Sequence, residues 1–117
     1  MTKDEVPIAT RTFLLNGNES VIAKIWQPFP DPESNSGTDY KCNIQILGIG
    51  DEKIRYAVGV DQFQALVLAM QRLGTLLYCS NEYKSGALQW LDMHDLGIPM
   101  PTGAEDYIFP FREHDVK

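Results

Sequence analysis

The sequence predicts an α+β fold: a meander of about four antiparallel strands, with one long amphipathic helix packed on one face of the sheet. Apolar and polar residues alternate over residues 40–47, as they do in a strand with one buried face. An Asn16-Gly17 pair separates two apolar segments, which is typical of a tight hairpin turn. After Asp61 the apolar residues recur with the spacing of a helix. These three observations define the two layers.

The first hairpin is expected to consist of strands at residues 8–15 and 20–27, joined through the Asn-Gly turn. Both residue types tolerate the positive φ that such turns require. Pro28 and the prolines that follow end the second strand, because proline lacks the N–H group that a sheet ladder needs. Residues 31–39 contain acidic, Ser, Asn and Gly residues, and we expect them to form an exposed acidic loop.

Two further strands are expected at residues 40–47 and 54–60, with a glycine-containing turn between them. In the second strand, Ile54, Tyr56, Val58 and Val60 alternate with Arg55 and Ala57. The polar strand positions are expected to face away from the helix: Lys24, Lys41, Asn43, Gln45 and Arg55.

The helix has a clear start. Asp61 is a good N-cap, and Gln64 three residues later completes a capping box. The apolar positions at helical spacing are Phe63, Leu66, Val67, Met70, Leu73 and Leu77. We expect the helix to end near Ser80-Asn81. Gly74 lies inside it and costs about 1 kcal/mol relative to alanine, which indicates that another segment packs closely there.

Regular structure is expected to become scarce after the helix. Residues 86–91 predict either a short fifth strand or an apolar connector, and residues 92–97 predict a helical turn. Prolines and a glycine then exclude regular structure. We expect a single domain over residues 1–117, with a loose lead at 1–7 and an irregular tail at 102–117.

The charge balance narrows the classes of partner. The chain of 117 residues has 10 Lys and Arg against 16 Asp and Glu, for a net charge of −6. Nucleic-acid binding needs a basic surface, so we do not expect DNA or RNA as a partner. A basic protein partner fits better, although such charge can also serve solubility alone. The chain has no apolar run of membrane-spanning length and no signal-peptide pattern, which predicts a cytoplasmic location without membrane contact.

Signatures of catalysis are absent from the sequence pattern. Cys42 and Cys79 lack metal-site spacing, and we expect them to be reduced and half-buried, with a disulfide between them left open. His94 and His114 lie beside carboxylates but in no wider catalytic motif. We therefore expect no catalytic residue, no metal, no cofactor and no enzyme. The alternative is an acid–base or ligand site near His94, formed with the neighbouring aspartates.

Two groups of residues suggest a binding surface. The expected partner-binding group flanks and includes the acidic loop: Trp26, Phe29, Asp31, Glu33 and Asp39. Aromatic residues beside a loop suit protein recognition, and the carboxylates would meet a basic partner. Trp26 has an equally good place in the core, because large aromatic side chains usually pack. The second group is Trp90, Tyr107, Phe109 and Phe111, which either cover an edge of the fold or form a docking strip.

Two motifs resemble those of a family of small bacterial proteins of unknown function. GVDQFQAL at residues 59–66 matches the pattern G-V-D-x-x-Q-A-L at a helix start. Residues 90–91, followed by residues 95–99, match W-L…D-L-G-[I/F]-P. The resemblance covers roughly residues 8–100. It implies a fold and no activity, because the motifs consist of a helix cap, core leucines and a turn.

In general type, a small acidic α+β protein without catalytic signatures is also similar to bacterial immunity proteins, which block a partner toxin by binding it. Our leading hypothesis is therefore a non-catalytic protein-binding module, in the form of an immunity protein that occludes a basic toxin. The first alternative is the enzyme or ligand-binding protein with a site near His94. The second is an oligomeric accessory protein that associates through an open sheet edge.

Overall fold

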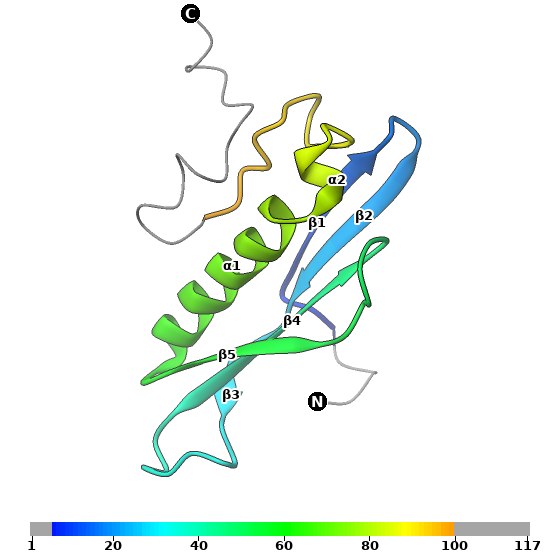
Figure 1. The fold of residues 1–117 in the computed structure, drawn as a ribbon. Helices are drawn as coiled ribbons and strands as arrows, with labels where there is room; N and C mark the ends of the chain where they lie inside the picture. The colour runs from blue at the N-terminus through cyan, green and yellow to red at the C-terminus, as the bar shows by residue number, and fades with distance from the viewer. Residues whose placement is uncertain (1–5, 100–117) are drawn as a thin grey trace, which may run out of the picture.

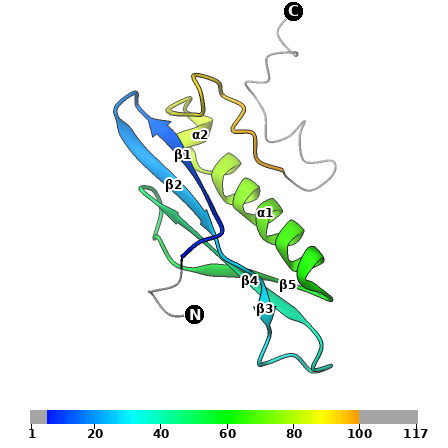
Figure 2. The ribbon, with the colours of Figure 1, turned by 180° about the vertical axis from the view of Figure 1, so that it is seen from behind.

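A computed structural model describes residues 6–99 of the chain. An antiparallel sheet forms one layer and helix α1 lies across one face of it, as the two opposite views show (Figure 1, Figure 2). The elements are β1 (Ala9–Leu15), β2 (Glu19–Ile25), β3 (Phe29–Pro30), β4 (Tyr40–Leu47), β5 (Arg55–Gly59), α1 (Gln62–Tyr78), α2 (Asn81–Lys84) and β6 (Leu88–Gln89). The expected α+β class is confirmed. Most of the expected lead at 1–7, and all of the expected tail at 102–117, lie outside the described residues.

The sheet has six strands, so the expectation of about four is an undercount. The long strands pair as a meander: β1 with β2, β2 with β4, and β4 with β5, each pair antiparallel. The two extra strands are β3, which pairs with the start of β4, and β6, which pairs with the end of β1. Each is only 2 residues long, which is too short for an alternating pattern to reveal it.

The core lies between the sheet and α1. Its largest fully buried side chains are Tyr78, Tyr83, Phe13, Ile44, Leu77, Leu88, Leu96, Val21 and Cys42. On α1 the buried positions Ala65, Ala69, Leu73 and Leu77 recur every fourth residue, so they form one line along the helix. The two alanines allow the first half of α1 to approach the sheet closely.

The helix α1 comes closest to the sheet at β5. The small residues Ala57 and Gly59 face α1, while Tyr56 and Val58 lie exposed on the opposite, uncovered face. A Cβ atom on Gly59 would overlap the backbone of Ala65. The apolar alternation expected for this strand is therefore present, but its small residues occupy the core face and its large ones do not.

The expectation that Arg55 faces away from the helix is wrong. Its Cα partner is the buried Ile44, and it shares a small cavity with Leu73 of α1. Arg55 is tolerated there because it begins the strand and reaches Asp51 through two hydrogen bonds of 2.9 Å. These bonds lower the pKa of the Asp51 carboxyl to about 2.

The expected pair of Asp61 and Gln64 caps the start of α1, although Gln64 bonds the residue before the N-cap and not the N-cap itself. Asp61 Oδ1 accepts a hydrogen bond from the backbone N–H of Gln64 at 2.8 Å, and Gln64 Oε1 accepts one from Val60 at 2.8 Å. The helix ends at Tyr78, slightly earlier than expected. Ser80 then caps α2, a helix of 4 residues that the sequence pattern does not predict.

The helical turn expected at residues 92–97 is wrong. A tight turn stands there instead: Leu91 and Asp92 have φ values of 52° and 63°. The residues on either side, Trp90 and Met93, exchange two backbone hydrogen bonds of 2.9 Å. Positive φ at both central residues is typical of a type I′ hairpin turn. Leucine is unusual in that position, so the sequence contains no clear signal for this turn.

The chain then returns along α1, where it is fastened by Tyr78. The Tyr78 hydroxyl donates to Asp95 Oδ1 at 3.1 Å and accepts from the backbone N–H of Leu96 at 2.9 Å. Farther along, a Cβ atom on Gly74 would overlap the carbonyl oxygen of Pro99. The close packing expected at Gly74 is therefore confirmed, and the segment responsible is residues 97–99.

We expect Gly74→Ala to lower the free energy of unfolding by about 1–3 kcal/mol, because the overlap with Pro99 outweighs the better helix propensity of alanine. Urea denaturation measures this change. Gln62→Ala, on the exposed first turn of the same helix, is the matched control and should stay within about 0.5 kcal/mol of the wild type. A Gly74→Ala protein more stable than the wild type would contradict the packing described here.

The two cysteines are both free and differ in exposure. Cys42 is fully buried on β4, where its Sγ donates to the carbonyl oxygen of Trp26 at 3.2 Å. Burial raises the pKa of the Cys42 thiol to about 11. Cys79 is exposed at the end of α1. The expectation of two half-buried thiols therefore holds for neither residue.

We expect iodoacetamide at pH 8 to alkylate Cys79 in the folded protein and to spare Cys42, since the thiolate is the reactive form. Intact-mass spectrometry should show one adduct per native chain and two in denaturant. The Cys79→Ser variant should remain unmodified until it unfolds. Rapid labelling of that variant under native conditions would show that Cys42 is accessible.

Candidate functional site

An acidic arm projects from one end of the sheet. We define it as residues 28–40, which comprise β3, the loop 31–39 and the first residue of β4 (Figure 1). At its base Phe29 and Pro30 pair with Lys41 and Tyr40. The backbone N–H of Asp31 also bonds the carbonyl oxygen of Asp39 at 2.9 Å, which closes the loop at its neck.

The loop of the arm is ordered by serine side chains. Ser34 Oγ accepts hydrogen bonds from the backbone N–H groups of Gly37 and Asp39, at 3.1 and 3.2 Å. Ser34 also contacts Ser36 Oγ at 3.1 Å, and Ser36 contacts Thr38 Oγ1 at 2.9 Å. The loop is therefore held by its own bonds, although its composition alone predicts only an exposed segment.

The acidic side chains of the arm are presented to solvent. Glu33 is exposed, and Asp31 and Asp39 are partly exposed. Asp31 Oδ1 accepts from the backbone N–H of Glu33 at 3.0 Å. Within residues 6–99, no Lys or Arg forms a salt bridge with any of the three carboxylates. Their negative charge is therefore available to an external cation.

The aromatic members of the expected surface differ in exposure. Trp26 is only 7% exposed, so it offers no contact area of useful size. Its backbone N–H continues the sheet by bonding the carbonyl oxygen of Asn43 at 3.0 Å. Phe29 is partly exposed and lies on the arm itself. Of the expected group, the structure brings Phe29, Asp31, Glu33 and Asp39 together at the surface and places Trp26 below it.

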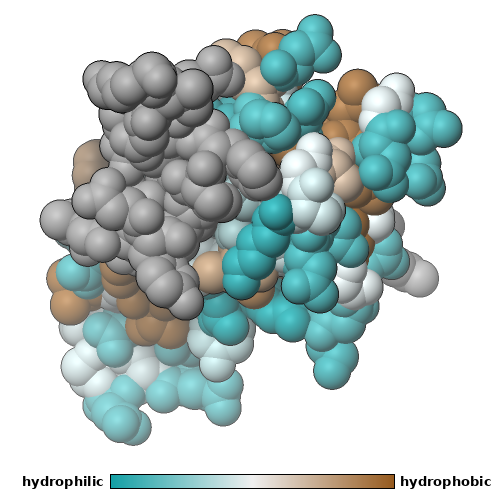
Figure 3. Space-filling view, turned by 45° about the horizontal axis from the view of Figure 1, so that its top comes forward, coloured by the Kyte–Doolittle hydropathy of each residue, from teal (hydrophilic) through white to brown (hydrophobic). Residues whose placement is uncertain are grey.

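An open hollow of about 520 Å³ lies where the arm meets the start of α1. It is lined by Pro28, Tyr40, Asp61, Gln62, Phe63 and Leu66. Phe63 is 77% exposed, and the neighbouring Val60 is also exposed. Figure 3 shows a brown, apolar patch at the lower left of the molecule, on the side where α1 begins. Teal, hydrophilic atoms lie directly below this patch. The hollow therefore lies between the base of the arm, which supplies Pro28 and Tyr40, and the first turns of α1.

The expectation that Phe63 belongs to the apolar face that α1 packs on the sheet is wrong. At about 100° per residue, Phe63 lies roughly 200° around the helix from Ala65, which belongs to the buried line. The signal that reveals this is the alanine pair Ala65 and Ala69 in register with the buried leucines. Those small residues mark the side of α1 that touches the sheet, and Phe63 is on the other side.

The two aspartates beside His94 in sequence have different surroundings. Asp92 is exposed in the tight turn. Asp95 Oδ1 is engaged by the Tyr78 hydroxyl and by the backbone N–H of Gly97, at 3.1 and 2.9 Å. Burial and the nearby Asp95 charge raise the pKa of Tyr78 well above its usual range, so its hydroxyl stays protonated. These groups fasten residues 95–97 to α1.

Two structural features are absent from the part of the chain that the structure describes. It contains no group of three or more His, Cys, Asp or Glu side chains placed to hold a metal ion. It also contains no helix that is long and apolar enough to cross a membrane.

The fold and the site define a class: a small α+β domain with one helix on a sheet and an acidic, partly apolar surface at one end. Residues 9–100 match a family described as a domain of unknown function (DUF6968), and the chain belongs to that family. The matched residues contain both motifs of the sequence analysis. Comparison with curated proteins and with solved structures gives no match.

We expect Ser34→Ala to loosen the arm without unfolding the domain. The amide of Asp39 loses its acceptor, so its hydrogen exchange should become faster by about fivefold, the equivalent of one hydrogen bond of about 1 kcal/mol. Asn35→Ala, in the same loop, is the matched control and should leave that rate unchanged. Equal exchange in both variants would show that the serine bonds do not hold the loop.

Proposed function

We propose that this protein is a non-catalytic protein-binding module, and that its binding surface is the acidic arm together with the hollow at its base. The observation that carries the proposal is the exposure of Phe63, 77%, in the lining of a hollow to which the base of the acidic arm also contributes. A large aromatic side chain in water is unfavourable unless a partner covers it. Aromatic residues are also the commonest anchors of protein interfaces.

The partner that fits this surface is a basic protein whose contact segment combines an apolar side chain with flanking Lys or Arg. The three carboxylates would attract it over a distance, and contact with Phe63 would hold it. The net charge of −6 supports the same preference and disfavours nucleic acid. We further propose that the module is a bacterial immunity protein that acts in the cytoplasm and blocks a basic toxin by occlusion.

A second candidate function is an oligomeric accessory protein. It is favoured by one observation: among the described residues, β1 pairs with β6 only at Leu14 and Leu15, so Ala9–Phe13 have a strand partner on one side alone. An open edge of this kind can pair with another chain. Light scattering separates the two candidate functions, because a protein that is monomeric at micromolar concentration cannot be the oligomeric accessory protein.

The proposed interface is tested with a partner captured from the native lysate and then purified. We expect Phe63→Ser to weaken binding by at least about 2 kcal/mol, or about 30-fold. Glu33→Lys combined with Asp39→Lys should slow association and flatten its dependence on salt. Surface plasmon resonance at several salt concentrations measures both effects.

Matched controls lie at the other end of the molecule. Leu91 is 70% exposed, so Leu91→Ser removes a similar apolar side chain outside the proposed surface. Glu19→Lys reverses an exposed charge at the β1–β2 hairpin, far from the arm in Figure 1. Both variants should bind as the wild type does. If Leu91→Ser weakens binding and Phe63→Ser does not, the interface is elsewhere and the proposal fails.

A further inference from the structure

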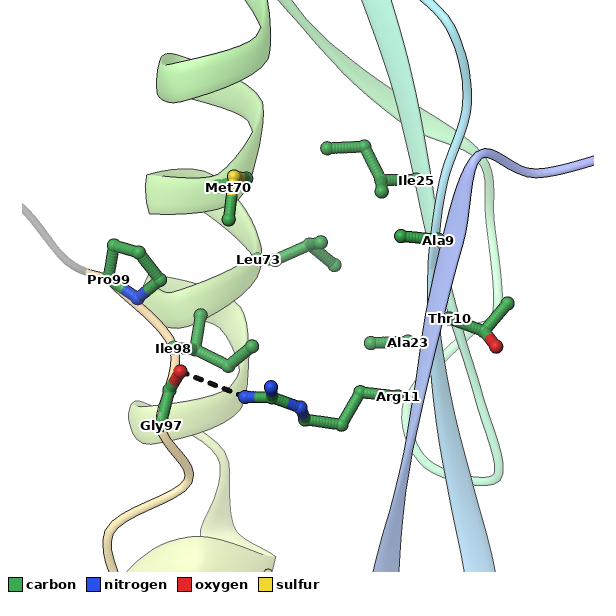
Figure 4. A pocket seen from close by; sticks show the side chains of 10 residues that line it. All are labelled: Ala9, Thr10, Arg11, Ala23, Ile25, Met70, Leu73, Gly97, Ile98 and Pro99. Carbon is green, nitrogen blue, oxygen red and sulfur yellow. Dashed lines mark hydrogen bonds between the residues drawn. The ribbon is translucent and has the colours of Figure 1, made fainter.

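A second, smaller pocket lies between the sheet and α1, on the side where β1 is open. Its volume is about 150 Å³. Ala9, Ala23 and Ile25 line it from the sheet, Met70 and Leu73 line it from α1, and Ile98 and Pro99 close the third side (Figure 4). Apart from Thr10 and Arg11, the lining is apolar or glycine. The pocket shares no residue with the hollow at the arm.

Arg11 supplies a fixed positive charge at one end of this pocket. Its Nη1 donates to the carbonyl oxygens of Gly97 and Leu96, at 2.9 and 3.3 Å, as Figure 4 shows for Gly97. Its guanidinium also stacks on Trp90, 3.9 Å from the ring centre. These contacts fix the side chain across the gap between β1 and residues 96–97.

Among the described residues, no carboxylate forms a salt bridge with Arg11. Its partners are two neutral carbonyl groups and an aromatic face, and no carboxylate lines the pocket. No residue in the range 6–99 accepts a hydrogen bond from its Nε or Nη2. Those two atoms form one edge of the guanidinium, which matches the two oxygens of a carboxylate. An apolar pocket with a cation at its end suits an anionic, largely apolar ligand.

We propose that this pocket binds a small monocarboxylate with a compact apolar body. The size follows from the volume, because aliphatic cavities of about 150 Å³ accept a benzene ring. The carboxylate follows from Arg11, whose free edge would hold it in two parallel hydrogen bonds. A polyanion such as a nucleotide does not fit, since the lining offers one cation and few other polar groups.

The chain itself also contains a segment that combines negative charge with apolar side chains. Residues 105–109 read Glu-Asp-Tyr-Ile-Phe, which combine carboxylates with apolar side chains, and they follow Pro99 closely in sequence. We favour a small molecule as the occupant, because a pocket of about 150 Å³ has room for one ring and not for several side chains of a peptide. The experiment below separates the two sources.

Benzoate is the probe, added to the full, ¹⁵N-labelled chain and followed by NMR. We expect saturable shifts of the amides at residues 9–11 and 97–98, with a dissociation constant of about 1 mM, as for a fragment-sized ligand. Benzamide has the same shape without the charge and should bind about tenfold more weakly. Acetate has the charge without the ring and should bind more weakly as well.

A pair of variants tests the location. Ala9→Leu fills the mouth of the pocket from an exposed position, so it should abolish the benzoate shifts without disturbing the core. Thr12→Leu makes the same kind of change at another exposed position on β1 that does not line the pocket, and it should bind benzoate normally. Thermal denaturation confirms that both variants fold.

Three results would overturn the proposal. Equal binding of benzoate and benzamide would show that Arg11 does not select a carboxylate. The absence of saturable shifts near the pocket at about 50 mM benzoate, well above the expected dissociation constant, would show that no such site exists. Nuclear Overhauser contacts between Ile98 and the ring of Tyr107 or Phe109 would assign the pocket to residues of the chain itself.

Discussion

Helix α1 approaches β5 on one side and residues 97–99 on the other so closely that glycine is needed at both contacts. Gly59 lies against Ala65 near the start of the helix, and Gly74 lies against Pro99 near its end. Between these two contacts, the small side chains of Ala65 and Ala69 allow the helix to lie close to the sheet. Both proposed sites depend on this packing: the hollow forms beside the first turn of α1, and the smaller pocket forms where residues 97–99 return along it.

The two proposed sites differ in the charge that accompanies their apolar surface. At the arm, the hollow lined by Phe63 lies at the base of a loop with three solvent-facing carboxylates, which suits a cationic partner. At the pocket, Arg11 is the one charged side chain among the described residues of the lining, and it suits an anion. The opposite signs and the different sizes mean that one ligand would not satisfy both, so each site can be tested with the other intact.

Much of the fold could be predicted because its signals are local. The period of residues 40–47, the Asn-Gly turn and the Asp61 cap each depend on a few adjacent residues. The errors arise where the structure depends on distant ones. Phe63 is exposed because Ala65 is the helix residue that lies against Gly59 of β5, and Arg55 faces the core because it pairs with Ile44 of β4. The acidic arm can be predicted from the composition of residues 31–39 alone. The pocket at Arg11 cannot, because it joins residues from both ends of the described chain.

The bond from Arg11 to Gly97 connects residues 86 positions apart. Two parts of the domain are built from segments that are close in sequence and can form first. One is the hairpin of β1 and β2, and the other consists of β4, β5 and α1. Within the described part of the chain, no strand pairs with residues 94–99, so these residues need the sheet and the helix to be in place before they can dock. We therefore expect the smaller pocket to close late in folding. We also expect residues 94–99 to open locally before the domain as a whole unfolds.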